Sequence, residues 1–291
     1  MTLQTNIRSM KKTLVLIAAA AGLALGGAPA MAAEGGAHAL RDGGFSFDGP
    51  FGAFHQGQLQ RGYKVYREVC ASCHSMNLMH FRTLAEPGGP FYDEHQVNPA
   101  ENRFVKALAK EVQIADIDTE TGEAMMRDGV PADRFPNPYP NATAAAAANG
   151  GAAPPDLSVM AKARHGGANY IYSLLMGYAA PPAGLEIRPG QHYNEYMAGD
   201  LTPFMPDSAH VPPGGFIAMP DPLRAGQVTY DDGTIASKDQ MAKDVAAYIA
   251  WASDPKQVQR KQTGVGVLIF LLLFAGVTYL SYRRIWKGVA H

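Results

Sequence analysis

Two cysteines and a histidine lie together in the run Cys70-Ala71-Ser72-Cys73-His74. Thiols at this spacing can add across the two vinyl groups of a porphyrin, and the histidine that follows can give an imidazole nitrogen to the iron. The pattern predicts that Cys70 and Cys73 hold one haem c covalently. It also predicts that His74 is the proximal axial ligand of the iron.

Three other uses of a Cys-x-x-Cys pair suit this chain less well. A structural zinc site needs about four ligands and usually a second cysteine pair, whereas the chain contains 2 Cys. A thioredoxin-like pair requires a β-α-β context, which the flanking sequence lacks. A disulfide between Cys70 and Cys73 would close a very short loop and stabilise little. Haem attachment is therefore the interpretation that we carry forward.

The second axial ligand decides what a haem can do, because methionine raises the reduction potential, histidine gives a lower one, and an open position permits ligand chemistry. Among the 13 Met, Met205 and Met219 each lie in a loop and precede a proline. A following proline biases a residue toward extended backbone, which suits presenting a side chain across a haem. The apolar residues 216–218 favour Met219, since they would exclude water from the iron. Burial in the core remains the ordinary alternative for either methionine.

His165 is a rival ligand, and it lies beside Arg164 in the polar run Ala163-Arg164-His165-Gly166-Gly167. This composition favours a turn that faces the haem propionates. There Arg164 could form a charge-assisted hydrogen bond with a propionate, although a solvated arginine would give the same pattern.

The segments that must position these residues are mostly helical. Apolar spacing and end signals predict helices over residues 56–69, from Pro99 onward, over residues 169–177, and from the capping box at 237–240 to a point before Pro255. Leu59, Tyr63, Tyr66 and Cys70 lie along one face of the first helix, and Phe104, Leu108 and Val112 share one face of the second. In the last helix one face contains Met241, Val245, Tyr248, Ile249 and Ala252.

Two stretches lack any periodicity, residues 116–151 and residues 183–213. Their Asp, Asn, Pro and Gly content is typical of irregular surface segments, and we expect no chemistry in the first of them. Helices separated by long irregular loops predict a mainly α fold. A first helix that carries the attachment motif and a last amphipathic helix resemble the fold of c-type cytochromes.

The two ends of the chain have the signatures of targeting and anchoring. Residues 1–32 combine a basic start, an apolar stretch and an Ala-x-Ala site, which predicts a cleaved signal peptide. Residues 264–282 carry no charge and are long enough to cross a bilayer. We therefore expect a periplasmic haem domain over 33–255, followed over 256–291 by a single transmembrane anchor in the bacterial inner membrane and a short cytoplasmic tail.

The net charge of −1 hides an asymmetry. Of the 25 basic residues, three lie in the predicted leader and six flank the apolar segment, so the exported domain keeps sixteen against 26 acidic residues. A negative field of this size favours rapid encounters with a basic protein partner. It also excludes nucleic acid as a partner.

The chain is similar, along the whole exported domain, to the cytochrome c1 family of the ubiquinol–cytochrome c reductase (cytochrome bc1) complex, in its alphaproteobacterial form. The motifs that carry this resemblance are residues 70–76, Pro154-Pro155-Asp156-Leu157-Ser158, residues 163–167, 170–178, 215–220 and 230–234, and the helix that contains 242–245.

The resemblance implies a role for each site residue. Cys70 and Cys73 would bind the haem, and His74 and Met219 would be its axial ligands. Arg164 would contact a propionate with Tyr170 nearby, and Pro154 and Pro155 would pack on the ring.

The resemblance also implies partners: cytochrome b, a Rieske iron–sulfur protein as electron donor, and a soluble or membrane-tethered cytochrome c as acceptor, in respiratory or photosynthetic electron transport. Some relatives brace the methionine loop with a disulfide, one cysteine of which corresponds to Ala179, and this chain has no cysteine to spare. An independent membrane-tethered electron shuttle, and a haem enzyme or gas sensor with an open distal position, remain alternative functions.

Overall fold

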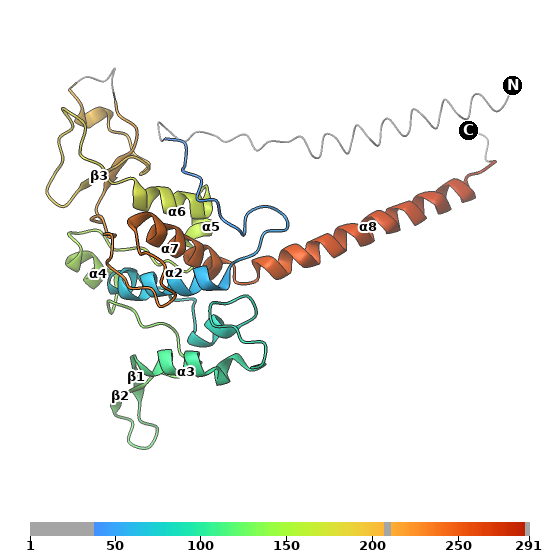
Figure 1. Cartoon of the computed structure of the whole chain (residues 1–291), viewed down its shortest axis with the longest axis horizontal. Helices are drawn as coiled ribbons and strands as arrows, with labels where there is room; N and C mark the ends of the chain where they lie inside the picture. Colours follow the sequence, from blue (N-terminus) through green and yellow to red (C-terminus); the bar gives the residue numbers. More distant parts are fainter. Residues whose placement is uncertain (1–37, 207–210, 289–291) are drawn as a thin grey trace. The chain divides into compact units, whose positions relative to one another are not determined.

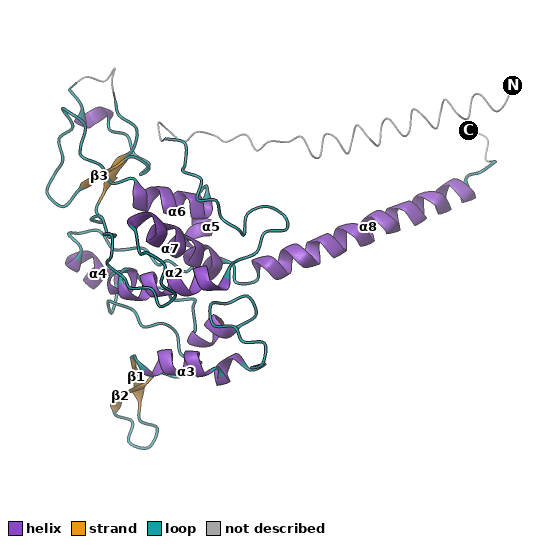
Figure 2. Ribbon diagram, viewed as in Figure 1, coloured by secondary structure: helices purple, strands orange, loops and turns teal. Residues whose placement is uncertain are grey.

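A computed structural model describes residues 38–206 and 211–288 of the chain. The predicted signal peptide lies outside these residues. Helices dominate, as predicted, and the strands are few and short (Figures 1 and 2). In chain order the elements are α2 (Gln56–Glu68), η1 (Cys70–Ser72), η2 (Phe81–Ala85), η3 (Pro99–Glu101), α3 (Arg103–Lys110), β1 (Gln113–Ile117), β2 (Ala124–Asp128), α4 (Ala142–Ala148), α5 (Met160–Ala163), α6 (Gly167–Met176), β3 (His192–Asn194), η4 (Thr202–Phe204), β4 (Gly215–Ile217), α7 (Lys238–Ser253) and α8 (Gln257–Ile285).

The core forms where α2 packs against α7, with α5 and α6 also packed on α7 (Figure 1). The face predicted for the first helix is the buried one, since Leu59, Tyr63 and Tyr66 are all buried. The rings of Tyr63 and Tyr66 lie 5.6 and 5.7 Å from the ring of Tyr248 on α7. Aromatic contacts between the two helices thus form the centre of the domain.

Gly62 allows α2 and α7 to approach closely. A Cβ atom at this position would lie 2.1 Å from the Asp244 carbonyl oxygen and 2.6 Å from the Tyr248 Cβ atom. Both distances are too short for non-bonded atoms, so the crossing requires a residue without a side chain.

A buried ion pair joins the same two helices. The Asp244 carboxylate, which is fully buried on α7, accepts hydrogen bonds from the Arg61 guanidinium at 2.9 Å and from the Gln240 amide at 2.9 Å. A second guanidinium nitrogen of Arg61 contacts Asp232 at 2.7 Å. The buried charge is therefore compensated on both sides, as such charges must be.

Helix α7 begins at the predicted cap, where the Ser237 hydroxyl accepts a hydrogen bond from the Gln240 backbone N–H. The second half of the predicted capping box does not form, because the Ser237 backbone N–H donates to the Ile235 carbonyl at 2.9 Å while the Gln240 side-chain amide donates to Asp244. Eleven of the sixteen residues of α7 are buried. The predicted apolar face is therefore correct but too narrow, since neighbouring helices cover α7 on several sides.

The predicted apolar face of the second helix is only partly correct, because Leu108 and Val112 pack against the core but Phe104 does not. Asn102 caps α3 by accepting the N–H groups of Phe104 and Val105, and the buried residues are Val105 and Ala109. Phe104 is 47% exposed and lies against Phe91 and beneath Arg103 at the surface. The helix begins only after the separate turn η3, and its inward side includes Val105 and Ala109 together with Leu108.

The two segments expected to be irregular contain regular structure. Residues 116–151 include part of the antiparallel hairpin β1–β2 and helix α4. Phe135, in the same segment, is buried because its backbone bonds Met79 and its ring stacks on that of Tyr66. Residues 183–213 include β3, which pairs antiparallel with β4 over a small second apolar cluster.

Helix α8 follows α7 almost directly. It is 29 residues long, its most apolar window has a mean hydropathy of 2.2, and none of its residues is buried. It is the one helix in the described ranges that is long and apolar enough to cross a membrane.

Candidate haem-binding site

The Cys-x-x-Cys-His run forms a tight turn at the end of α2. Cys70 to Ser72 adopt the 3₁₀ turn η1, and the Cys70 carbonyl accepts the backbone N–H groups of Cys73 at 3.1 Å and of His74 at 2.8 Å. The two thiols and the imidazole are thereby presented from five successive residues at this turn. The helix delivers the motif at its C-terminal end, as the sequence predicts.

The orientation of the His74 ring is set by Pro155. Its Nδ1 atom lies 2.8 Å from the Pro155 carbonyl oxygen. Because a carbonyl oxygen can only accept, Nδ1 must carry a proton, which leaves the Nε2 lone pair free for a metal. Burial lowers the pKa of His74, against the opposing effects of the Pro155 hydrogen bond and Asp156, so the neutral imidazole that iron requires is favoured.

Asp156 ties the segment that contains Pro155 to the residues after His74. Its carboxylate accepts the Ser75 hydroxyl at 2.8 Å, the Asn77 backbone N–H at 2.7 Å and the Ser158 backbone N–H at 2.8 Å. The Leu157 N–H donates to the Ser75 carbonyl at 2.9 Å. Residues 154–158 therefore run beside residues 74–78 and hold the Pro155 carbonyl in position.

Both cysteines are free thiols. Burial, with a smaller contribution from Cys73, raises the pKa of the Cys70 thiol to about 12. A protonated thiol is a poor metal ligand, and no group of three or more His, Cys, Asp or Glu side chains in residues 38–206 and 211–288 could hold a metal ion. The donor set of two thiols and one Nε2 atom fits a covalently attached haem.

The structure separates the two methionine candidates. Met219 is half-buried and packs against the main core, whereas Met205 packs against the second cluster of Leu185, Tyr193 and Leu201. The Met76 sulfur lies in the core, 3.7 Å from the Tyr248 hydroxyl. Met219 thus shares its core with the helices that present the attachment turn.

The remaining candidates lie in two places, at the turn between α5 and α6 and in the segment before Asp156. Arg164 and His165 are exposed, and an Arg164 guanidinium nitrogen lies 3.3 Å from the Ala163 carbonyl oxygen. Tyr170 is half-buried against the main core. Pro154 is half-buried and Pro155 is exposed. Among the residues that the structure describes, Arg164 forms no ion pair with an acidic side chain.

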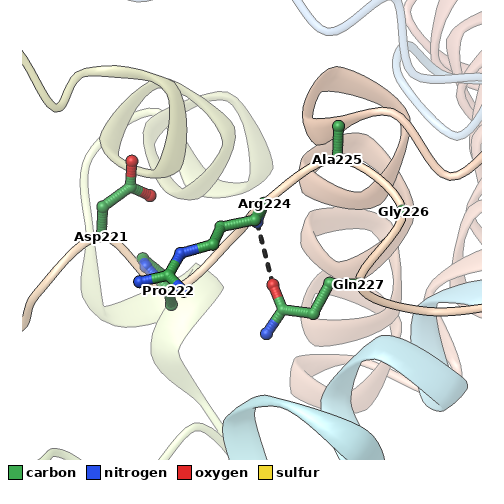
Figure 3. A pocket seen from close by; sticks show the side chains of 6 residues that line it. All are labelled: Asp221, Pro222, Arg224, Ala225, Gly226 and Gln227. Atoms are coloured by element: carbon green, nitrogen blue, oxygen red, sulfur yellow. Dashed lines mark hydrogen bonds between the residues drawn. The ribbon is translucent and has the colours of Figure 1, made fainter.

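A shallow hollow of about 430 Å³ lies in the segment 221–227, which follows Met219 in the sequence (Figure 3). It is lined by Asp221, Pro222, Arg224, Ala225, Gly226 and Gln227. Across it the Arg224 backbone N–H donates to the Gln227 side-chain oxygen at 2.9 Å. Since it contains none of the thiol, imidazole or thioether groups, it is not the haem site.

Three residues near the predicted site carry contacts that spacing did not reveal: Asp156, Tyr139 and Tyr178. The Asp-x-Ser pattern at 156–158 is a turn signal that could have identified the first. The Tyr139 hydroxyl lies 3.9 Å from the Cys73 sulfur, in a segment where we expected no chemistry. The Tyr178 hydroxyl donates to the Met219 carbonyl at 3.0 Å, a contact between distant residues that has no local sequence signal.

The chain is also similar in sequence to proteins of a known family. Residues 45–289 match the family described as the Cytochrome C1 family. The chain is 43% identical to "Cytochrome c1" of Rhodospirillum rubrum, over 95% of this chain and 97% of that relative. It is 43% identical to "Cytochrome c1 1, heme protein, mitochondrial" of Arabidopsis thaliana, over 82% of this chain and 69% of the relative. It is also 39% identical to "Cytochrome b/c1" of Bradyrhizobium diazoefficiens, of which it spans 40%.

Proposed function

The chain belongs to the cytochrome c1 family, and on that premise we propose that it is the monohaem electron-transfer subunit of a ubiquinol–cytochrome c reductase (cytochrome bc1) complex. It accepts one electron from a Rieske iron–sulfur protein and passes it to a soluble or membrane-tethered cytochrome c. The observation that carries the proposal is the Cys70–His74 turn, in which the Pro155 carbonyl leaves one imidazole nitrogen free for iron.

When bound, haem c supplies a one-electron couple between ferric and ferrous iron. Cys70 and Cys73 hold it through thioether bonds, and His74 presents its Nε2 atom. Met219 would supply a thioether to the iron, which would stabilise the ferrous state and raise the potential. Arg164 would pair with a propionate beside Tyr170, and Pro154 and Pro155 would lie against the ring. The protein itself performs no acid–base or nucleophilic step.

The partners follow from the family and from charge. Cytochrome b and the Rieske protein are the neighbours within the complex, and the relative named "Cytochrome b/c1" supports the first of these. The excess of acidic residues in the haem domain favours a basic cytochrome c as acceptor. Helix α8 anchors the chain in the bacterial inner membrane, with the haem domain in the periplasm and the C-terminus in the cytoplasm.

The proposal is tested by redox titration of the detergent-solubilised native preparation and of two methionine variants. Met219→Leu is expected to keep covalent haem, lower the potential and allow carbon monoxide to bind the ferrous protein. Met205→Leu is the matched control and should behave as the native protein. An unchanged potential in Met219→Leu would remove Met219 as ligand, and purification without cytochrome b would favour an independent tethered shuttle.

A further inference from the structure

The turn that contains Met219 has few main-chain ties of its own. Strand β4 ends at Ile217, two residues before the methionine. Pro220 follows it and has no backbone N–H to donate. A hydroxyl from elsewhere in the chain makes the contact at this point: the Tyr178 side chain donates to the Met219 carbonyl oxygen at 3.0 Å.

The backbone of Tyr178 is held in place by neighbouring elements. It follows the end of α6 and forms an isolated antiparallel bridge with Asn194, which in turn pairs with Gly215 of β4. Asn194 is fully buried, and its amide donates to the Leu174 carbonyl of α6 at 2.8 Å. The position of the Tyr178 hydroxyl is therefore fixed by α6 and by strand β3, which pairs with β4 just before the Met219 turn.

A second contact holds the same turn from α7. The Lys238 ammonium lies 2.6 Å from the Asp221 carboxylate, two residues after Met219. The same ammonium lies 5.7 Å from the centre of the Tyr178 ring, within the range of a cation–π contact. Lys238 is the first residue of α7, which packs on α2. Through Tyr178 and Lys238, the turn is thus tied to the helices of the haem-bearing core.

We propose that Tyr178 is a positioning residue for the second axial ligand: its hydroxyl holds the Met219 turn so that the thioether remains on the iron. This inference rests on the proposed function, because it requires Met219 to be that ligand. A neutral thioether is a modest donor, so its retention depends on how rarely the turn moves away. Both cysteines of the chain lie in the attachment motif, so no disulfide can brace the Met219 turn. The hydrogen bond from Tyr178 takes that role.

The test compares Tyr178→Phe with Tyr193→Phe in the intact complex. Phenylalanine keeps the ring at position 178 and its cation–π contact, and removes only the oxygen. Tyr193 is the matched control because it lies on β3 of the same sheet and donates to the Pro213 carbonyl at 2.5 Å. Both variants are assayed for covalent haem content, thermal stability, reduction potential, the methionine–iron charge-transfer band and the rate of carbon monoxide binding.

We expect Tyr178→Phe to retain haem, weaken the charge-transfer band, lower the potential and speed carbon monoxide binding. Loss of one hydrogen bond should raise the open population by roughly 2- to 10-fold. Tyr193→Phe should leave the band and the potential unchanged.

Native-like values in Tyr178→Phe, beside a lowered potential in Met219→Leu, would overturn the inference and leave the proposed function standing. Equal changes in both tyrosine variants would also overturn it, because they would indicate general loosening of the sheet. An unchanged potential in Met219→Leu would overturn both the inference and the ligand assignment.

Discussion

The Nδ1 atom of His74 lies 2.8 Å from the carbonyl oxygen of Pro155, across 81 positions of sequence. That carbonyl belongs to the residue just before Asp156, whose carboxylate ties the two segments together. The position of a single backbone oxygen thus decides which imidazole nitrogen can face iron. A mutation cannot remove this backbone oxygen, but it can remove the Asp156 carboxylate that holds the segment in place.

Asp156→Asn is predicted to destabilise the domain and to lower the yield of covalent haem. The amide loses the charge that strengthens its hydrogen bonds, at a cost of about 1–3 kcal/mol in the free energy of unfolding. Asp93→Asn is the control, since the Asp93 carboxylate accepts a single backbone N–H in a loop of its own. Chemical denaturation and haem staining measure both effects, and equal losses in the two variants would contradict the assigned role.

The same carboxylate makes stability depend on pH. Burial raises the pKa of Asp156, but hydrogen bonds from Ser158, Asn77 and Ser75 outweigh burial and lower it overall. A carboxyl whose folded pKa is lowered contributes stability above its unfolded pKa of about 3.9, and loses it as pH falls through the folded pKa. Below about pH 4 the native protein should therefore lose stability more steeply than Asp156→Asn, as thermal melts across pH would record.

Gly62→Ala is predicted to lower the free energy of unfolding by about 3 kcal/mol or more. The new methyl group would overlap the Asp244 carbonyl oxygen and push α2 away from α7. Gly57→Ala, in the first turn of the same helix, meets only the end of the Arg61 side chain at 3.9 Å. That control should be neutral or stabilising by about 0.5–1 kcal/mol. Similar melting temperatures for the two variants would show that the helices do not cross so closely.

Asp244→Asn is predicted to be among the more damaging polar substitutions. Removing one partner of a buried ion pair costs about 3–5 kcal/mol, and the lower end applies here because Arg61 keeps its contact with Asp232. Asp231→Asn breaks the exposed pair with Lys64 and should cost less than about 1 kcal/mol. Urea unfolding of the two variants provides the comparison.

A chain that stops after Thr263 is predicted to remain in the aqueous fraction with an unchanged haem spectrum. The removed part of α8 contributes no buried residue to the domain, whereas Lys261, which donates to the Phe47 carbonyl at 2.6 Å, is kept. The full chain should sediment with membranes and resist alkaline extraction. Partition of the shortened chain into the membrane pellet would point to a second membrane contact.

Much of the fold was predictable because its signals are local. Each of the signals that predicted it correctly lies within a single helix. These are the spacing of Leu59, Tyr63 and Tyr66, the Ser237 cap and the uncharged run at 264–282. The exposure of Phe104 on α3 and the hairpin β1–β2 were not predicted. The first depended on where a short turn ended, and the second on strand pairing between exposed residues that carry no apolar alternation.

The sequence by itself predicted the chemistry of the candidate site, since Cys70, Cys73 and His74 lie within five successive residues and their spacing indicates haem attachment. Only the tertiary structure decided how that chemistry is held. The Pro155 carbonyl that orients His74 and the Tyr178 hydroxyl that meets Met219 come from 81 and 41 positions away. Hydrogen bonds between such distant groups depend on how helices and loops pack, and no local pattern of residues records them.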